Sequence, residues 1–362
     1  MIKPASPTFG ISSISTYRPP LTLPNSWFRN LPRKFEAQTG ITERAISFES
    51  EAEMAVKAID SLMRKNNAEL RNCRALIVVS PSLVPMSVAA RYLAPTLARH
   101  EQPTRVAHCV ANRIGIRPRH TIGINSFCSG FARALQLLIH RHLPGLQLSE
   151  REFALVVCSN RISRIANFDC PTSGALFGDF AAATMVTRTD NSDYPVRYQI
   201  LDAQVMKKRV SNSLFDFCRV NNARVVTESG GHSLESSRLV FSLAGIAIAE
   251  AASRGMAEAA ASCLSENGLS TRDVRAIVPH QAGTGIVRLA ALKLQDIGFT
   301  TTPVANGLTK KVGNISSCSV PFALKREWNN LQGNILCPVA AVGRPGKKEI
   351  SQGCILLRRV DN

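Results

Sequence analysis

The chain of 362 residues lacks the features that mark several large classes of protein. No apolar run approaches the roughly 18 residues that a membrane-spanning helix needs, and the best stretch, Leu239 to Ala249, is interrupted by Ser242 and Gly245. The ten cysteines include no Cys-x-x-Cys pair and no regular spacing with histidine, so they predict neither a disulfide framework nor a metal site. Charged residues make up 19% of the chain, too few for a disordered protein. We expect a compact protein with reduced thiols, no membrane span and no bound metal.

Acidic residues are scarce, since 26 Asp and Glu face 44 Lys and Arg, which leaves a formal charge of +18. Such a charge attracts acidic partners, although it also serves simple solubility. The bases form short scattered clusters without interleaved aromatic residues, which argues against nucleic-acid binding. The first ten residues contain Lys3 but no long apolar run, so we expect no secretory leader and a cytoplasmic location.

The length suggests two domains or one fold built from two halves, because domains average about 150 residues. Two pairs of segments resemble each other: 54–81 with 256–280, and 120–140 with 310–328. In the first pair an amphipathic helix pattern leads into a short β-branched run, and in the second a strand end containing glycine leads into a helix. The sequence therefore predicts a duplicated α/β unit. The polar stretch 187–194 places the boundary between halves 1–190 and 191–362.

One cysteine stands where a predicted strand gives way to a helix. Cys128 follows Asn125, Ser126 and Phe127, and Gly130 opens the apolar helix that comes next. Free N–H groups and the peptide dipoles at a helix amino terminus favour the thiolate, which is the nucleophilic form of cysteine. Any single cysteine can instead be an inert buried residue. We predict that Cys128 is a nucleophile.

Two further polar residues occupy similar junctions in the second half. His280 lies just past the predicted strand that ends near Val278, at the edge where open α/β sheets bind ligands. Asn314 precedes the helix that contains Phe322, and it matches Asn125 of the first half. On its own, Asn314 could equally be a helix cap.

Taken together, these motifs resemble the ketoacyl-acyl carrier protein synthase III family of the thiolase superfamily. The resemblance runs from Phe9 to Arg359 and rests on five motifs in the family's order: TGITER (39–44), INSFCSGF (124–131), LFGD (176–179), VPHQAGTGI (278–286) and VGNISSCSVPFAL (312–324). It implies a thiolase-like α/β fold, in which two duplicated halves form a five-layered α-β-α-β-α arrangement. It also implies that the protein forms a homodimer.

The resemblance further implies a reaction and a role for each residue. Cys128 would take a medium or long acyl group from a thioester of coenzyme A or of an acidic acyl carrier protein, with no permanently bound cofactor. His280 and Asn314 would hold the oxygen of a malonyl- or β-ketoacyl-thioester while carbon dioxide leaves, and the resulting enolate would attack the acyl group. The N–H groups of Cys128 and of Gly343 or Arg344 would form the oxyanion hole.

Two departures from the family pattern point to a specialised role in secondary metabolism. Ser126 and Phe127 stand where two alanines are usual, and Gln38 stands where an arginine often precedes the TGI element. Two alternatives stay open. The chain could pass the acyl group to an O, N or C nucleophile without decarboxylation, or it could be a non-catalytic subunit of a heteromeric synthase.

Overall fold

A computed structural model describes residues 8–146, 148–171 and 173–360. The expectation about a leader segment falls largely on residues 1–7, which lie outside the described residues. Within the described ranges, the helices found are all too short or too polar to cross a membrane. The same residues contain no group of three His, Cys, Asp or Glu side chains that could hold a metal ion.

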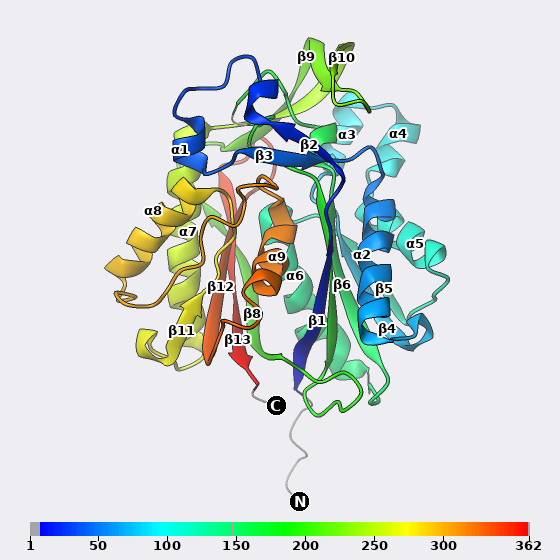
Figure 1. The fold of residues 1–362 in the computed structure, drawn as a ribbon, viewed down its shortest axis with the longest axis vertical. Helices are drawn as coiled ribbons and strands as arrows, with labels where there is room; N and C mark the ends of the chain where they lie inside the picture. The colour runs from blue at the N-terminus through cyan, green and yellow to red at the C-terminus, as the bar shows by residue number, and fades with distance from the viewer. Residues whose placement is uncertain (1–7, 147, 172, 361–362) are drawn as a thin grey trace, which may run out of the picture.

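The described residues form one nine-stranded mixed sheet, which bends where its two halves meet (Figure 1). In sheet order its strands are β11 (Val274–Ile277), β12 (Asn334–Val342), β13 (Glu349–Arg359), β8 (Tyr198–Arg209), β1 (Phe9–Tyr17), β7 (Phe180–Arg188), β6 (Phe153–Asn160), β4 (Cys73–Val79) and β5 (His120–Ile124). The halves join through β1 and β8, which pair only at Gly10 with Gln199 and at Ile11 with Tyr198. Because this contact is short, each half curves away and leaves room for helices between them.

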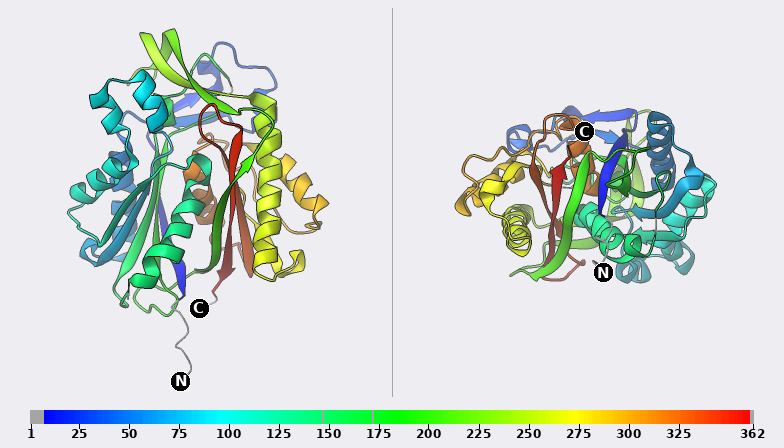
Figure 2. Two further views of the ribbon diagram at one scale, coloured as in Figure 1. Left: turned by 180° about the vertical axis from the view of Figure 1, so that it is seen from behind. Right: turned by 90° about the horizontal axis from the view of Figure 1, so that it is seen from below.

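The helices complete five layers, as Figures 1 and 2 show. The helices are α1 (Phe35–Thr39), α2 (Glu51–Asn66), α3 (Met86–Tyr92), α4 (Pro95–His100), α5 (Pro103–Arg113), α6 (Gly130–Leu137), α7 (Gly245–Glu266), α8 (Thr284–Asp296) and α9 (Ser319–Arg326). Helices α6 and α9 lie between the two half-sheets, α2 and α5 cover one outer face, and α7 with α8 covers the other. The predicted α-β-α-β-α order is confirmed.

Side-chain alternation along the strands explains this layering. In β4, Ala75, Ile77 and Val79 face the central core with α6, whereas Leu76 and Val78 face the outer core with α2 and α5. A strand that is buried on both faces reads as a continuous apolar run, which is why the sequence predicts it correctly. The other predicted strands, 153–159, 181–186 and 275–278, are likewise found within one or two residues of their expected ends.

Helix α2 illustrates how local sequence fixes an element. Ser50 accepts a hydrogen bond from the Glu53 N–H and Glu53 accepts one from the Ser50 N–H, so the capping box satisfies two groups at the helix start. The helix ends at Asn66, and the next residue, Asn67, has a φ of 49°, the left-handed conformation common after a helix. Its apolar face packs on the sheet and holds the first half together.

The sequence duplication corresponds to a structural one. Helix α2 leads into β4, as α7 leads into β11. The 3₁₀ turn η3 (Phe127–Ser129) precedes α6, and η8 (Ser316–Cys318) precedes α9, with a constant offset between the two turns. Two strands lie outside this repeat, β9 (Phe215–Val226) and β10 (His232–Leu243), which form a hairpin above the main sheet. A small pair, β2 (Leu21–Pro24) and β3 (Glu43–Ile46), lies nearby.

Candidate active site

Cys128, His280 and Asn314 line one cavity of about 80 Å³ between the two halves. Cys128 lies in the turn after β5, His280 follows β11, and Asn314 precedes η8. Cys128 and His280 thus each lie just beyond the carboxyl end of a strand, which is where ligands bind in open α/β folds. The structure therefore brings together the three side chains that the sequence singled out.

Matching turns present the facing groups. The Phe127 N–H donates to Asn125 Oδ1 (3.3 Å), and the Ser316 N–H donates to Asn314 Oδ1 (2.9 Å). Phe127 and Ser316 both adopt left-handed backbone conformations, with φ of 43° and 50°, which costs about 1 kcal/mol or more for a residue with a Cβ. These backbone conformations let the two turns face each other, and Cys128 Sγ lies 3.5 Å from Ser316 Oγ.

The thiol of Cys128 is held in its neutral form. Burial raises its pKa to about 11, while the hydrogen bond from Ser316 acts in the opposite direction. The sequence predicted a thiolate at a helix amino terminus, and that direction was wrong. Desolvation in the largely apolar cavity is the largest influence on this pKa, and Cys128 lies in the turn before α6 and not in the helix itself.

His280 is almost fully buried and has one ring nitrogen engaged. Its Nδ1 lies 2.6 Å from Ser319 Oγ, which also accepts the Gln281 N–H at 3.3 Å. The hydroxyl proton is thus available to Nδ1, and the ring proton then resides on Nε2. Burial lowers the pKa of His280 to about 4, so the ring is neutral at pH 7.

Asn314 is positioned by the LFGD segment. The Asn314 N–H donates to Leu176 O (2.8 Å), and the Gly178 N–H donates to Asn314 O (3.1 Å). A Cβ on Gly178 would lie 2.0 Å from Val312 O, so only glycine permits this approach. Because Oδ1 accepts from Ser316, and no acceptor for Nδ2 is found in the described part of the chain, the carboxamide N–H groups are free to meet a ligand.

The aspartate of the LFGD segment holds the neighbouring loops. Asp179 accepts hydrogen bonds from the N–H groups of Ser47 and Ser163 and from the Ser163 hydroxyl. It is fully buried, and burial raises its pKa to about 6 in spite of these bonds. The motif thus has a structural role beside the cavity.

Aromatic side chains close the cavity. Phe127 contributes from the turn η3 and Phe177 from the LFGD segment. Phe215 and Phe241 contribute from the β9–β10 hairpin. The sequence reasoning missed the two hairpin residues and the contact of Ser316 with the thiol. The offset between the duplicated turns was the signal that could have identified Ser316.

The two nominated oxyanion-hole residues lie in the β12–β13 hairpin. The Gly343 N–H donates to Glu349 O (3.1 Å), and the Arg344 N–H donates to Glu349 Oε1 (2.9 Å). Neither residue lines the cavity, although their neighbours Val342 and Ile350 do. By contrast, the Cys128 N–H lies beside its own sulfur, where it lowers the pKa of the thiol.

Basic clusters that are separate in the sequence meet at this hairpin. Residues Lys207 to Arg209 of β8 pair with Glu349 to Ser351 of β13, directly beside the exposed tip of the hairpin. The exposed bases brought together are Lys207, Lys208, Arg209, Arg344, Lys347 and Lys348. We call these six residues the basic tip. Only Glu258 and Glu349 pair with them in the described residues.

Two family descriptions match the chain. Residues 122–207 match 3-oxoacyl-[acyl-carrier-protein] synthase III, and residues 264–343 match the C-terminal region of the same family. The first range contains Cys128, and the second contains His280 and Asn314.

Similar proteins agree with this assignment. The chain is 27% identical over 328 residues to a 3-oxopimeloyl-[acyl-carrier-protein] synthase of Rhodothermus marinus, covering 89% of this chain and 83% of that one. It is 25% identical to a β-ketoacyl-[acyl-carrier-protein] synthase III of Vibrio cholerae, covering 84% and 76%.

Among solved structures, the priming β-ketosynthase of the R1128 polyketide pathway superimposes with a TM-score of 0.69. It is 20% identical and covers 99% of both chains. That likeness supports the thiolase-like fold. With residues 122–207 and 264–343 matched by its two descriptions and relatives that carry its name, the chain belongs to the 3-oxoacyl-[acyl-carrier-protein] synthase III family of condensing enzymes.

Proposed function

We propose that the chain catalyses a decarboxylative Claisen condensation between an acyl thioester and a malonyl- or β-ketoacyl-thioester. The observation that supports this most directly is that Cys128, His280 and Asn314 share one cavity, with the nucleophile on one half and two hydrogen-bond donors on the other. Family membership agrees with this chemistry.

In the first step the sulfur of Cys128 attacks the carbonyl carbon of the acyl thioester. The bond to the carrier's sulfur breaks, and the proton of the Cys128 thiol ends on the departing carrier thiol. The N–H of Cys128 is proposed as one donor to the oxyanion. Gly343 or Arg344 could supply a second donor only if the hydrogen bonds to Glu349 opened.

In the second step a malonyl-type thioester replaces the leaving thiol. His280 Nε2–H and Asn314 Nδ2–H are proposed to donate to its thioester oxygen, which becomes negatively charged as carbon dioxide departs. The enolate carbon then attacks the acyl carbon on Cys128, releasing the sulfur, which takes up a proton from water. Because His280 stays neutral down to about pH 4, it acts as a hydrogen-bond donor and not as a cation.

The cavity suits a short acyl group. A volume of about 80 Å³ closed by four phenylalanine rings leaves room for a few carbon atoms. We therefore propose a shorter donor than the medium or long chain that the sequence suggested. The ring of Phe127 beside the nucleophile also supports a specialised substrate and hence a role in secondary metabolism.

The test is to supply short acyl thioesters with malonyl thioesters and to measure the mass of the intact protein and the release of carbon dioxide. Cys128→Ala should lose the acyl adduct, whereas Cys218→Ala, which alters an exposed cysteine, should keep it. His280→Ala and Asn314→Ala should keep the adduct but slow carbon dioxide release by about 100-fold or more.

Two results would favour the alternatives. An acyl adduct on Cys128 without any carbon dioxide release would indicate transfer to another nucleophile. Absence of an adduct with every donor would indicate a non-catalytic subunit.

The basic tip supports an acidic acyl carrier protein as the partner that delivers the thioester. The base of the hairpin lines the cavity through Val342 and Ile350, while its tip carries the positive charges. A carrier bound there would hold its thioester near Cys128. Complementary charge raises the association rate of such a partner.

We also propose a homodimer. Strand β5 is the last strand of the sheet, and its free edge offers unpaired backbone groups to a second copy. Light scattering of the purified protein checks this, and a monomer at micromolar concentration would contradict it.

A further inference from the structure

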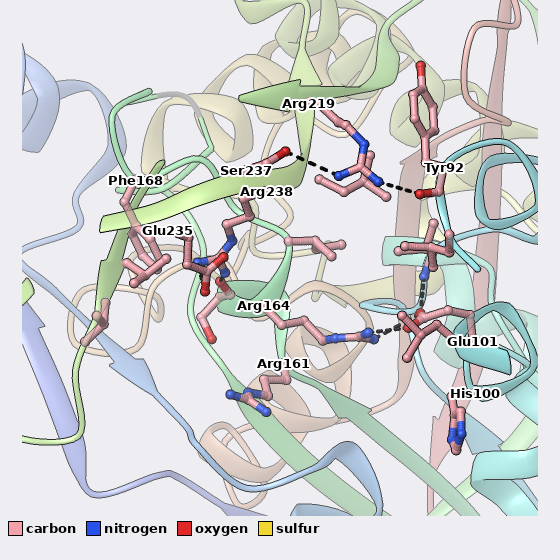
Figure 3. Close-up of a pocket in the computed structure, with 18 of the residues that line it drawn as sticks. Tyr92, His100, Glu101, Arg161, Arg164, Phe168, Arg219, Glu235, Ser237 and Arg238 are labelled. Carbon is pink, nitrogen blue, oxygen red and sulfur yellow. Dashed lines mark hydrogen bonds and ion pairs between the residues drawn. The ribbon is translucent and has the colours of Figure 1, made fainter. Parts of the chain in front are cut away.

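A second cavity, of about 660 Å³, lies outside the proposed catalytic site (Figure 3). It opens between the β9–β10 hairpin, helices α3 and α4, and the 3₁₀ turn η6 (Ile162–Arg164). We call it the arginine groove, because the guanidinium groups of Arg161, Arg164, Arg219 and Arg238 all line it. Two carboxylates, Glu101 and Glu235, are the acidic groups of its lining.

The two carboxylates of the lining do not compensate the positive charge of all four arginines. Arg164 pairs with two carboxylates, since its Nη1 lies 3.0 Å from Glu101 Oε2 and 3.5 Å from Glu51 Oε1. Arg238 Nη1 lies 3.9 Å from Glu235 Oε1. Arg161 and Arg219 form no ion pair with any carboxylate in the described residues. The lining of the groove thus holds four guanidinium groups and two carboxylates, and an added anion would compensate the two arginines that lack an ion pair.

Arg161 has donors to spare. Its Nε donates to Ser47 O (2.9 Å), but neither Nη atom reaches an acceptor within the described ranges. Arg238 is constrained in a similar way, since its Nη2 donates to Ser163 O (2.6 Å). Burial lowers the pKa of Arg238, and the nearby charges act in both directions: Glu235 and Asp179 raise this pKa, whereas Arg161 and Arg164 lower it.

The turn that carries these arginines is held firmly. Ser82 Oγ accepts the Arg161 N–H at 2.9 Å, and Asp179 accepts both the N–H and the hydroxyl of Ser163. Such hydrogen bonds favour ligand binding, because a turn that is already rigid loses little conformational entropy when a ligand binds.

The rest of the groove is apolar. Ile165, Leu239 and Val84 line it, and Ile165 also lines the cavity of Cys128. We propose that the arginine groove binds an amphiphilic organic anion, with a carboxylate or phosphate group between Arg161 and Arg238 and a hydrocarbon part against Ile165 and Leu239. Planar guanidinium groups suit both oxyanions, through charge-assisted hydrogen bonds. This site does not depend on acyl chemistry at Cys128.

The first experiment is calorimetric titration of the full chain with octanoate, octyl phosphate and octanol at about 0.15 M salt. This salt concentration screens exposed charges but weakens ion pairs between partly buried groups much less. At least one of the two anions should bind saturably, and octanol should bind at least tenfold more weakly. Binding of octanoate alone, or of octyl phosphate alone, identifies the preferred head group. No saturable binding of either anion, or equal binding of octanol, would overturn the proposal.

Substitutions test whether the anion binds in the arginine groove. Arg161→Gln should weaken binding at least tenfold, whereas Arg151→Gln, which changes an exposed arginine paired with Asp193, should leave it unchanged. Cys128→Ala should also bind normally. If Cys128→Ala lost anion binding while Arg161→Gln kept it, the anion would be assigned to the catalytic cavity and the groove site would be refuted.

Chemical modification tests the unaltered protein in case Arg161→Gln fails to fold. Phenylglyoxal reacts with accessible guanidinium groups, and peptide mass spectrometry locates the products. The bound anion should slow modification of Arg161 several-fold but leave Arg151 unprotected. Equal rates at Arg161 with and without a saturating anion would count against the site.

Discussion

The cysteine and histidine of the cavity are both neutral in the resting protein. With a pKa of about 11, the Cys128 thiol is ionised in only about 1 molecule in 10,000 at pH 7. With a pKa of about 4, His280 carries no charge to stabilise a thiolate. The hydroxyl of Ser316 is therefore the side-chain group in the described residues that favours ionisation of the sulfur.

Replacing Ser316 by alanine should raise the pKa of Cys128 further. Alkylation of Cys128 by iodoacetamide requires the thiolate, so its rate at pH 8 should fall several-fold and its pH profile should move to higher pH. Peptide mass spectrometry follows Cys128 specifically. Ser317→Ala removes the next hydroxyl, which does not contact Cys128, and should leave the profile unchanged. Identical profiles for wild type and Ser316→Ala would contradict this role.

Asp179 should make the stability of the fold depend on pH. Its pKa is about 6 in the folded chain and about 3.8 when exposed, so the folded state binds the proton more tightly. The stabilising contribution is complete below about pH 4 and is lost as the pH rises through 6, by roughly 3 kcal/mol. Urea unfolding of wild type and Asp179→Asn at pH 4 to 7 measures it. The variant should lack this slope, and parallel curves for the two proteins would refute the assignment.

The β9–β10 hairpin acts as a cover over the cavity, and its rings limit the acyl group. Phe241→Ala removes a ring from the lining, so donors several carbons longer should acylate Cys128. The same change should cost about 3 to 5 kcal/mol of stability, as for other buried aromatic truncations. Intact mass after incubation with acyl thioesters of graded length gives the preference. Phe217→Ala, in the same hairpin but outside the cavity lining, should keep the wild-type length limit.

The elements that the sequence predicted are those with strong local patterns. The doubly buried strands and helix α2 were found where expected, and so were the turns beside Cys128 and Asn314. Helix α7 was found but begins at Gly245, well before the predicted start at Met256. The β9–β10 hairpin was missed although Phe215 and Phe217 alternate with polar or exposed residues as in a half-buried strand. The signal is weak because the middle of β9, residues 218–222, is largely exposed and polar. The N–H groups of Gly343 and Arg344 both donate to Glu349. The local sequence pattern does not predict these hydrogen bonds, because they form across the β12–β13 hairpin.

At the scale of the whole molecule, the fold brings together positively charged residues that are far apart in the sequence. The clusters 207–209 and 344–348 become one basic tip only because β8 and β13 are neighbours in the sheet. Net charge and the family resemblance predicted an acidic partner, and the pairing of β8 with β13 is the basis for proposing that this partner docks at the basic tip.

Reversing the charge of the basic tip should slow association with an acidic acyl carrier protein. In stopped-flow measurements at low salt, Lys347→Glu with Lys348→Glu should reduce the association rate at least tenfold and flatten its dependence on salt. The matched control is Arg33→Glu with Lys34→Glu, an exposed pair beside α1, which should change the rate little. Equal losses in both double variants would mean that only net charge matters.

The paired turns at Phe127 and Ser316 bear on how a site of this kind arises. Two identical subunits meeting about a twofold axis must present the same side chain at each equivalent position, so a thiol on one side brings a thiol on the other. Here one continuous polypeptide supplies both turns, and the symmetry is free to break. Asn125 gives its carboxamide N–H to Leu83 O and its turn carries the sulfur, while Asn314 keeps its N–H groups open. Asymmetric chemistry has thus become possible on a nearly symmetric frame.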